Sequence, residues 1–297
     1  MKKPILLNIK TANEFSVQQV DPGMIGTMDD GIQCLDSFTQ NGVPYLIALK
    51  KDNGLAQIYE AFSGKAFIKE TMIASLAFNV TTLAATIDTD RAPLCLAYDS
   101  TSGKLSVIDI APNTELRTVS ASDIGAGATT LATFTYRKHL FFIAYNKENG
   151  HVAKYQITVN ASPYSVSIRK VWSDRWAQEW TRFSFFQLGA ENFFIKTNIK
   201  YNKVNIDHFM DDPGEGSHPV LNIDAPAQMV GVNNVTTFAG AKGFPYFATY
   251  RSNGEMTFNR IYGNCQGWDT LLQMTTSPGK KLMLTLEINN KNYLMLY

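Results

Sequence analysis

The stretch HLFFIAYNKENGHVAKYQI, His139–Ile157, decides how this chain folds. It begins with an apolar run rich in aromatic residues, passes through a polar turn that ends in Asn149-Gly150, and continues with alternating apolar residues. A period of two is typical of a β-strand, and an Asn-Gly turn between two such runs indicates a hairpin. The stretch therefore predicts two antiparallel strands.

Weaker copies of this hairpin recur along the whole chain. They begin at Pro44, Pro93, Asn192, Pro245 and Asn292, and the last copy, NYLMLY, reaches only residue 297. The first strand of each hairpin ends, in chain order, at Leu49, Tyr98, Tyr145, Thr197, Tyr250 and Tyr297, at spacings of 49, 47, 52, 53 and 47 residues. Counting on from residue 297 through residue 1 to Leu49 adds another 49 residues, so the period passes through the termini.

A period that passes through the termini predicts a closed ring, because the end repeats of an open solenoid are usually atypical. The sixth copy lacks two strands, which the runs Pro4–Lys10 and Glu14–Val20 can supply. The sequence thus predicts an all-β fold, a six-bladed β-propeller in which residues 4–20 complete the blade of residues 281–297. We expect a single domain over residues 1–297, since no linker rich in Pro, Gly or Ser interrupts the repeat.

Each repeat also carries a strand before its hairpin and another after it. The preceding runs Val80–Ala84, Ala128–Ala132 and Val235–Ala239 are nearly identical and consist of small and β-branched residues. We expect these to be innermost strands, because the strands crowd around the central axis. Outer strands are predicted at Ala66–Ile73, Glu115–Val119, Val166–Trp172, Pro219–Ile223 and Trp268–Thr275.

Overall charge and hydropathy limit the partners of this chain. With 27 basic and 26 acidic residues the net charge is +1, which provides no global field to attract nucleic acid or an anionic membrane. No run of about 18 apolar residues predicts a membrane span. The apolar run after Lys3 ends at Ile9 and is too short for the core of a signal peptide, so we expect a cytoplasmic protein, with release by a non-classical route left open.

No cofactor or metal ion is predicted. Cys34, Cys95 and Cys265 are odd in number and scattered, which favours reduced thiols over a disulfide framework. The four histidines fall in predicted loops or outer strands. The acidic turn at residues 211–215 lacks the alternation of a calcium-binding loop.

The fourth repeat carries the most specific motif. It has tryptophan at positions 172, 176 and 180, then Thr181, Phe183, Phe186 and Gly189. This pattern resembles the repeat of the PLL-type bacterial propeller lectins, which are built of seven such units, whereas this chain has six. Most of the other repeats here lack the tryptophans. The resemblance implies a carbohydrate-binding protein that recognises fucosylated or O-methylated glycans.

A lectin site needs aromatic faces for the apolar side of a sugar ring and fixed polar groups for its hydroxyls. The connection from Trp172 to Arg182 contains both kinds of side chain. The predicted ligand-binding residues are Trp172, Asp174, Arg175, Trp176, Glu179, Trp180 and Arg182, with Tyr201 and Trp268 as further aromatic candidates on turns. The alternative is that these tryptophans only pack between blades, since burial of a large aromatic side chain is strongly favourable.

Three classes of function follow from this sequence. The first is a non-enzymatic, lectin-like propeller; weak binding at each site would then favour a homo-oligomer, which gains affinity through multiple contacts. The second is a protein-binding propeller platform with no sugar site. A propeller hydrolase or lactonase is less favoured, because the predicted inner strands hold mostly Thr, Leu, Ala and Phe with scattered Asp36, Asp88 and Glu287.

Overall fold

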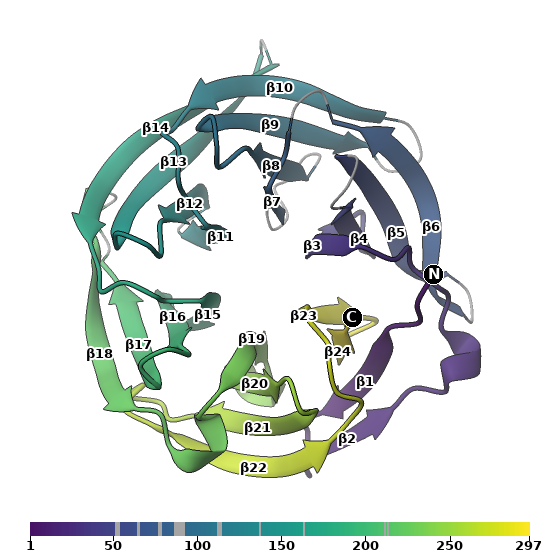
Figure 1. Ribbon diagram of the computed structural model, residues 1–297. Coiled ribbons are helices and arrows are strands. Elements are labelled where there is room, and N and C mark those ends of the chain that lie inside the picture. The colour runs from purple at the N-terminus through teal and green to yellow at the C-terminus, as the bar shows by residue number, and fades with distance from the viewer. Residues whose placement is uncertain are drawn as a thin grey trace.

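The computed structural model describes residues 1–50, 54–63, 66–76, 79–85, 93–111, 115–136, 138–162, 164–210, 212 and 214–297. Asp88, named above as a possible inner-strand acid, lies outside these ranges, as do residues 211 and 213 of the acidic turn. Six four-stranded antiparallel sheets form a ring around a central axis (Figure 1). The chain is a six-bladed β-propeller, as the repeat predicts.

Each of the first five blades is continuous in sequence and is numbered here in chain order from its inner strand outward. Blades 1 and 2 contain β3 (Ile32–Gln40), β4 (Val43–Lys50), β5 (Leu55–Ser63) and β6 (Ala66–Ser75), then β7 (Thr82–Ala85), β8 (Leu94–Tyr98), β9 (Lys104–Ala111) and β10 (Glu115–Asp123). Blades 3 and 4 contain β11 (Thr130–Tyr136), β12 (His139–Tyr145), β13 (His151–Ala161) and β14 (Tyr164–Arg175), then β15 (Arg182–Leu188), β16 (Glu191–Asn198), β17 (Lys203–Phe209) and β18 (Ser217–Asp224). Blade 5 contains β19 (Val232–Ala239), β20 (Pro245–Arg251), β21 (Glu255–Ile261) and β22 (Trp268–Thr275).

Blade 6 joins the two ends of the chain. Its strands, from the axis outward, are β23 (Met283–Ile288), β24 (Lys291–Leu296), β1 (Ile5–Lys10) and β2 (Ser16–Gln19). Leu7 pairs with Leu294 across β1 and β24, and Figure 1 shows the purple start of the chain beside its yellow end. The predicted closure of the ring by the N-terminal strands is therefore confirmed.

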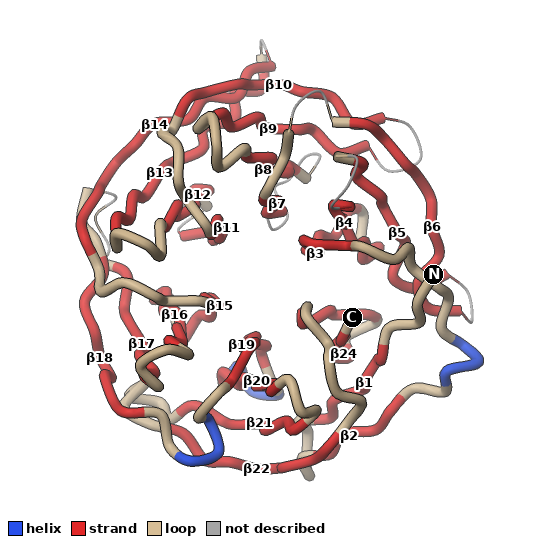
Figure 2. The backbone as a smooth tube through the Cα atoms, in the orientation of Figure 1, coloured by secondary structure: helices blue, strands red, loops and turns tan. Residues whose placement is uncertain are grey.

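Regular helix is limited to three short 3-10 turns among the described residues, as the tube view shows (Figure 2). They are η1 (Pro22–Met24), η2 (Ala227–Met229) and η3 (Ala241–Gly243). The segment between Trp172 and Arg182 forms the end of β14, a loop and the start of β15. Its three tryptophans, spaced four apart, therefore do not lie on a helix.

The hydrophobic core is divided among the six interfaces between neighbouring blades. The described residues form six clusters of buried side chains, one for each pair of adjacent blades. The alternation along each strand sends side chains to the two neighbouring blades in turn. Each blade packs against two neighbours, so removal of one blade would expose two interfaces at once. Burial of each Leu or Phe side chain in them contributes about 1.5–3 kcal/mol.

Hydroxyl side chains link the inner strands around the axis. Thr285 donates a hydrogen bond to the carbonyl of Thr237 at 2.9 Å, and Thr237 donates to the carbonyl of Phe185. The Asp36 carboxylate accepts one from the backbone N–H of Ala85 at 2.8 Å. The inner strand is the free edge of each sheet, so these bonds satisfy backbone groups that have no strand partner. This requirement explains why the inner strands are rich in threonine.

The tyrosines that mark the sequence repeat connect one blade to the next. The hydroxyls of Tyr98, Tyr145 and Tyr250 each donate to a backbone carbonyl of the following blade-to-blade connection, at 2.7, 2.7 and 3.0 Å. Each hydroxyl also accepts from a backbone N–H of that connection, at 3.1, 3.2 and 2.9 Å. Tyr297 donates to the carbonyl of Asp29 in the same way. We call this arrangement the tyrosine bridge; Leu49 and Thr197 occupy the two repeat positions without a tyrosine.

In the described part of the chain, the blade-to-blade connections lie on one face of the ring, together with the turns between the second and third strands of the blades. We call this the connection face. At Gly150 the connection passes so close that an added Cβ would collide with the carbonyl of Trp176. Gly150 has a φ of 75°, which also favours glycine. This face holds the candidate sites described below.

Candidate functional site

The two central tryptophans of the predicted sugar site lie in the interface between blades 3 and 4. Trp180 is only 5% exposed and belongs to the buried cluster of that interface. The half-buried Trp176 ring stacks on Phe194, with centroids 5.5 Å apart and an interplanar angle of 22°, and it also contacts Tyr145. Both rings therefore stabilise the packing of the two blades.

A buried ion pair occupies the space in front of these rings. The Lys196 Nζ atom lies 4.3 Å from the ring centroid of Trp176 and 4.8 Å from that of Trp180. It also lies 2.6 Å from Oδ2 of Asp207, and the side chains of Lys196 and Asp207 are 4% and 3% exposed. Burial lowers the pKa of Lys196, and Asp207 opposes that shift. The Lys196 ammonium thus occupies the aromatic faces of Trp176 and Trp180 that a sugar ring would need.

The polar residues predicted around these tryptophans are more exposed. Asp174 and Arg175 end the outer strand β14 at the rim. Glu179 forms an ion pair with Lys200 at 2.9 Å, which lowers the pKa of its carboxyl through the hydrogen bond from Lys200. Tyr201, 54% exposed on the turn between β16 and β17, lies beside the same lysine, whose Nζ atom is 5.4 Å from its ring. These side chains form a rim and do not complete a pocket with Trp180.

The remaining predicted residues lie in three different places. Trp172 is half-buried on β14, and its indole lies against Gly216, where an added Cβ would collide with the ring. Arg182 is at the start of the inner strand β15, next to the axis. Trp268 begins β22 and packs edge-on against Phe247 at 5.3 Å, instead of lying exposed on a turn. The nine predicted residues therefore do not converge on one site.

The connection between blades 4 and 5 differs from its neighbours because it has no tyrosine bridge. The repeat position is occupied by Thr197, whose hydroxyl is buried without a hydrogen-bond partner among the described residues. Arg251 contacts this connection instead, with its Nη2 atom donating to the carbonyl of Ala227. The guanidinium reaches the connection from the following blade, and a cavity opens beside it.

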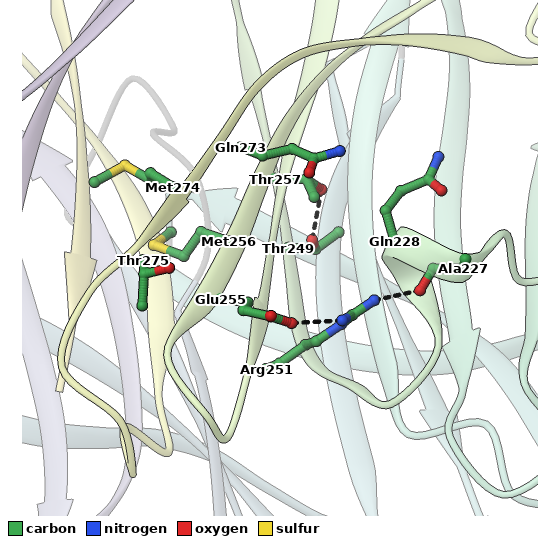
Figure 3. Close-up of a pocket in the computed structure, with 10 residues that line it drawn as sticks. All are labelled: Ala227, Gln228, Thr249, Arg251, Glu255, Met256, Thr257, Gln273, Met274 and Thr275. Atoms are coloured by element: carbon green, nitrogen blue, oxygen red, sulfur yellow. Dashed lines mark hydrogen bonds and ion pairs between the residues drawn. The ribbon is translucent and has the colours of Figure 1, made fainter.

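This cavity has a volume of about 460 Å³ and is drawn in Figure 3. Arg251 and Glu255 form an ion pair at 2.5 Å on one side of it. The hydroxyls of Thr249 and Thr257 are 2.7 Å apart. The polar lining residues are Gln228, Thr249, Arg251, Glu255, Thr257, Gln273 and Thr275, and the others are Ala227, Met256 and Met274. We call this cavity the blade 4–5 pocket.

The ion pair in the blade 4–5 pocket is fixed by several hydrogen bonds. Arg251 donates to Glu255 through Nη1 and to Ala227 through Nη2, while its buried Nε has no partner among the described residues. The Asn253 side chain and the Arg251 guanidinium hold the pKa of Glu255 below its usual value, so this carboxylate is charged at neutral pH. The pocket therefore offers a fixed donor and a fixed acceptor side by side.

The same repeat positions have different residues in the preceding interface. Because Thr197 and Tyr250 are equivalent, Lys196 of blade 4 corresponds to Thr249 of blade 5. Lys196 extends into its interface and is covered by tryptophan, whereas the short Thr249 leaves space in front of it. The residue at this repeat position therefore distinguishes the filled interface between blades 3 and 4 from the open one between blades 4 and 5.

Asp36 is the charged group of the inner strand β3. Its carboxylate accepts backbone hydrogen bonds from Ala85 and Ser37, each at 2.8 Å. Burial raises its pKa to about 6, and those two bonds oppose the shift. Asp36 thus links blades 1 and 2, and its carboxylate accepts both of these hydrogen bonds from the protein backbone.

Within the described ranges, no three His, Cys, Asp or Glu side chains come together as metal ligands. Cys34, Cys95 and Cys265 are free thiols. The described part of the chain also contains no helix long and apolar enough to cross a membrane.

No protein-family model matches this chain, and no curated protein matches it. Solved structures do resemble it. The SapL1 lectin in complex with α-methyl fucoside has a TM-score of 0.58 at 12% identity, with 89% of each chain covered. A candidate 6-phosphogluconolactonase from Bacteroides fragilis has a TM-score of 0.61 at 9% identity, covering 99% of this chain and 87% of its own. A protein from Lactobacillus plantarum has a TM-score of 0.55 at 9% identity, with both chains covered completely. At these identities the likeness shows a shared propeller fold.

Sequence reasoning missed the residues that distinguish the two interfaces. Lys196 and Asp207 stand inside the apolar runs FFIKT and VNIDHF, and a charge in such a run is a signal of a buried pair. Arg251 and Glu255 flank the turn Ser252-Asn253-Gly254 and resemble ordinary solvated charges. Their role follows only from the position of the connection that Arg251 contacts.

Proposed function

We propose that this chain is a non-enzymatic, carbohydrate-binding propeller and that the blade 4–5 pocket is its sugar site. The observation that carries the proposal is the lining of that pocket, where a guanidinium, a carboxylate, two primary amides and three threonines surround about 460 Å³ of space. Small-molecule sites range over roughly 300–1,000 Å³. Planar side chains with paired donors and acceptors match the adjacent hydroxyls of a sugar ring.

The accessibility of the Arg251–Glu255 ion pair supports this assignment. The Arg251 and Glu255 side chains are 22% and 50% exposed, so a ligand hydroxyl can reach the outer part of each charged group. Arg251 would donate to one hydroxyl of the ligand, and Glu255 would accept from a second. The lining offers one carboxylate, already paired to Arg251, whereas glycoside hydrolysis uses two; this favours binding over bond cleavage.

The ligand class proposed is a fucosylated or O-methylated glycan. The resemblance of the fourth repeat to the PLL-type lectins supports it, as does the likeness in fold to a lectin in complex with α-methyl fucoside. A few hydrogen bonds in competition with water give about 4–5 kcal/mol, which corresponds to millimolar or sub-millimolar affinity. We propose that a homo-oligomer raises the apparent affinity by presenting several sites.

The experiment is a titration of the ¹⁵N-labelled protein with methyl α-fucoside, followed by NMR. We expect the side-chain amides of Gln228 and Gln273 to shift, while the indole N–H of Trp176 stays unchanged. A shift at Trp176 without one at the glutamines would instead locate binding on the tryptophan connection. If neither methyl α-fucoside nor any fucosylated or O-methylated glycan shifts either group, the sugar site is refuted and the protein-binding platform becomes the leading function.

A further inference from the structure

A second cavity opens on the connection face, next to the axis of the ring. Its volume is about 430 Å³, and it lies where blades 4, 5 and 6 meet. Its lining includes Arg182 at the start of β15, and Lys280 and Lys281 just before β23. Asn233, Asn234 and Ser252 complete its polar lining. We call this the axial pocket.

The Arg182 guanidinium is held in place and keeps a free side. Its Nε donates to Oδ1 of Asn234 at 2.9 Å, and its Nη1 donates to the carbonyl of Thr181 at 2.9 Å. Asn234 is 4% exposed and donates in turn to the carbonyl of Lys281 at 3.2 Å. These bonds fix the plane of the guanidinium, and Nη2 has no hydrogen-bond partner within the described part of the chain.

The three cations of the axial pocket have no counter-charge. No carboxylate of the described residues forms an ion pair with Arg182, Lys280 or Lys281. Other exposed cations of the protein do have such a partner, for example Lys200, Lys203 and Arg260. Burial, and after it the charge of Lys2, lowers the pKa of Lys280. A bound anion would supply the counter-charge that these three side chains lack.

We propose that the axial pocket binds a small anionic ligand through its phosphate or carboxylate group, with Arg182 as the fixed donor. Both groups accept hydrogen bonds from guanidinium and ammonium groups, so they share one recognition chemistry. Lys281 and Lys280 supply the remaining charge, and Asn233 and Ser252 supply neutral donors at the wall. The site is separate from the blade 4–5 pocket and does not depend on sugar binding there.

The test uses the full-length protein and two probes, inorganic phosphate and succinate, at constant ionic strength made up with sodium chloride. Binding is followed by the NMR signals of the Arg182 Nε–H and of the Asn233 and Asn234 side-chain amides. We expect saturable shifts for at least one probe at roughly 10 mM or below. A response to phosphate alone assigns a phosphate ligand, and a response to succinate alone assigns a carboxylate ligand.

Two variants and a control locate the charge. Arg182→Gln should weaken binding about tenfold or more, the expected loss for a charge-assisted hydrogen bond. Lys281→Gln removes an exposed side chain without disturbing the fold and should weaken it several-fold. Lys291→Gln removes the same charge at the start of β24, on the opposite face, and should leave binding unchanged.

Three results would overturn the proposal. The first is the absence of saturable shifts with either probe, and the second is full binding by Lys281→Gln. The third is an equal loss in Lys291→Gln, which would show only general attraction of anions to a positive surface. Because none of these readouts involves a sugar, the outcome is independent of the function proposed for the blade 4–5 pocket.

Discussion

The hydroxyl of Tyr145 accepts a hydrogen bond from the backbone N–H of Trp180 at 3.2 Å, across the interface between blades 3 and 4. The same hydroxyl donates to the carbonyl of Ala177 at 2.7 Å. Tyr145 is fully buried, so both connection groups would be left without a partner if the hydroxyl were removed. The residue that marks the sequence repeat is thus also the residue that connects consecutive blades.

Substitution of Tyr145 by Phe should therefore lower the free energy of unfolding by about 1–3 kcal/mol, because a buried donor and a buried acceptor lose their partner. Urea denaturation measures the effect. Tyr201→Phe, which removes a hydroxyl from a side chain 54% exposed, is the matched control and should change stability by about 0.5 kcal/mol or less. Equal stability of the two variants would contradict a structural role for the tyrosine bridge.

Deletion of residues 1–20 removes β1 and β2 and should destabilise the whole ring. Blade 6 would keep only β23 and β24, and the apolar faces of Leu6 and Leu7 would be lost from the interfaces on both sides. We expect cooperative loss of the β-sheet circular dichroism signal at a lower temperature. A truncated protein that melts at the temperature of the parent would refute closure by the N-terminal strands.

The ion pair between Lys196 and Asp207 should show strong coupling. Lys196→Met leaves a buried carboxylate unpaired, and Asp207→Leu leaves a buried ammonium unpaired, so each should cost about 3–5 kcal/mol. The double variant removes both charges and should be less destabilised than either single variant. Urea denaturation of all four proteins provides the double-mutant cycle, and additive losses would show that the pair is not coupled.

Stability should depend on pH through Asp36. Its pKa is raised from 3.8 to about 6 in the folded state, so the folded protein binds more protons than the unfolded chain between these values. The free energy of unfolding should therefore rise as the pH falls from 7 towards 4.5, by about 1–2 kcal/mol from this residue, after discounting for solvent near the axis. Asp36→Asn should lose this increase; the same slope in both proteins would contradict the assignment.

The ring can be predicted from the sequence, because the repeat period and the two strands missing from the sixth repeat are both visible there. The spacing of Tyr98, Tyr145 and Tyr250 predicts the blades, and the two N-terminal runs complete the sixth. The site is harder to predict, because the direction of an aromatic face depends on tertiary packing. Nothing near Trp176 in the sequence indicates that Lys196, twenty residues later, lies on its ring. In the same way, the distance between Gln228 and Arg251 in the chain hides their position in one pocket.

The most direct test of carbohydrate binding is a glycan array carrying fucosylated and O-methylated glycans. It would be probed with the parent protein, Arg251→Gln and the distant control Lys291→Gln, each confirmed as folded by circular dichroism. We predict that the parent and Lys291→Gln bind the same glycans and that Arg251→Gln loses about tenfold or more in signal, because it removes the charged donor of the blade 4–5 pocket. No glycan bound by the parent, or full binding by folded Arg251→Gln, would contradict the account.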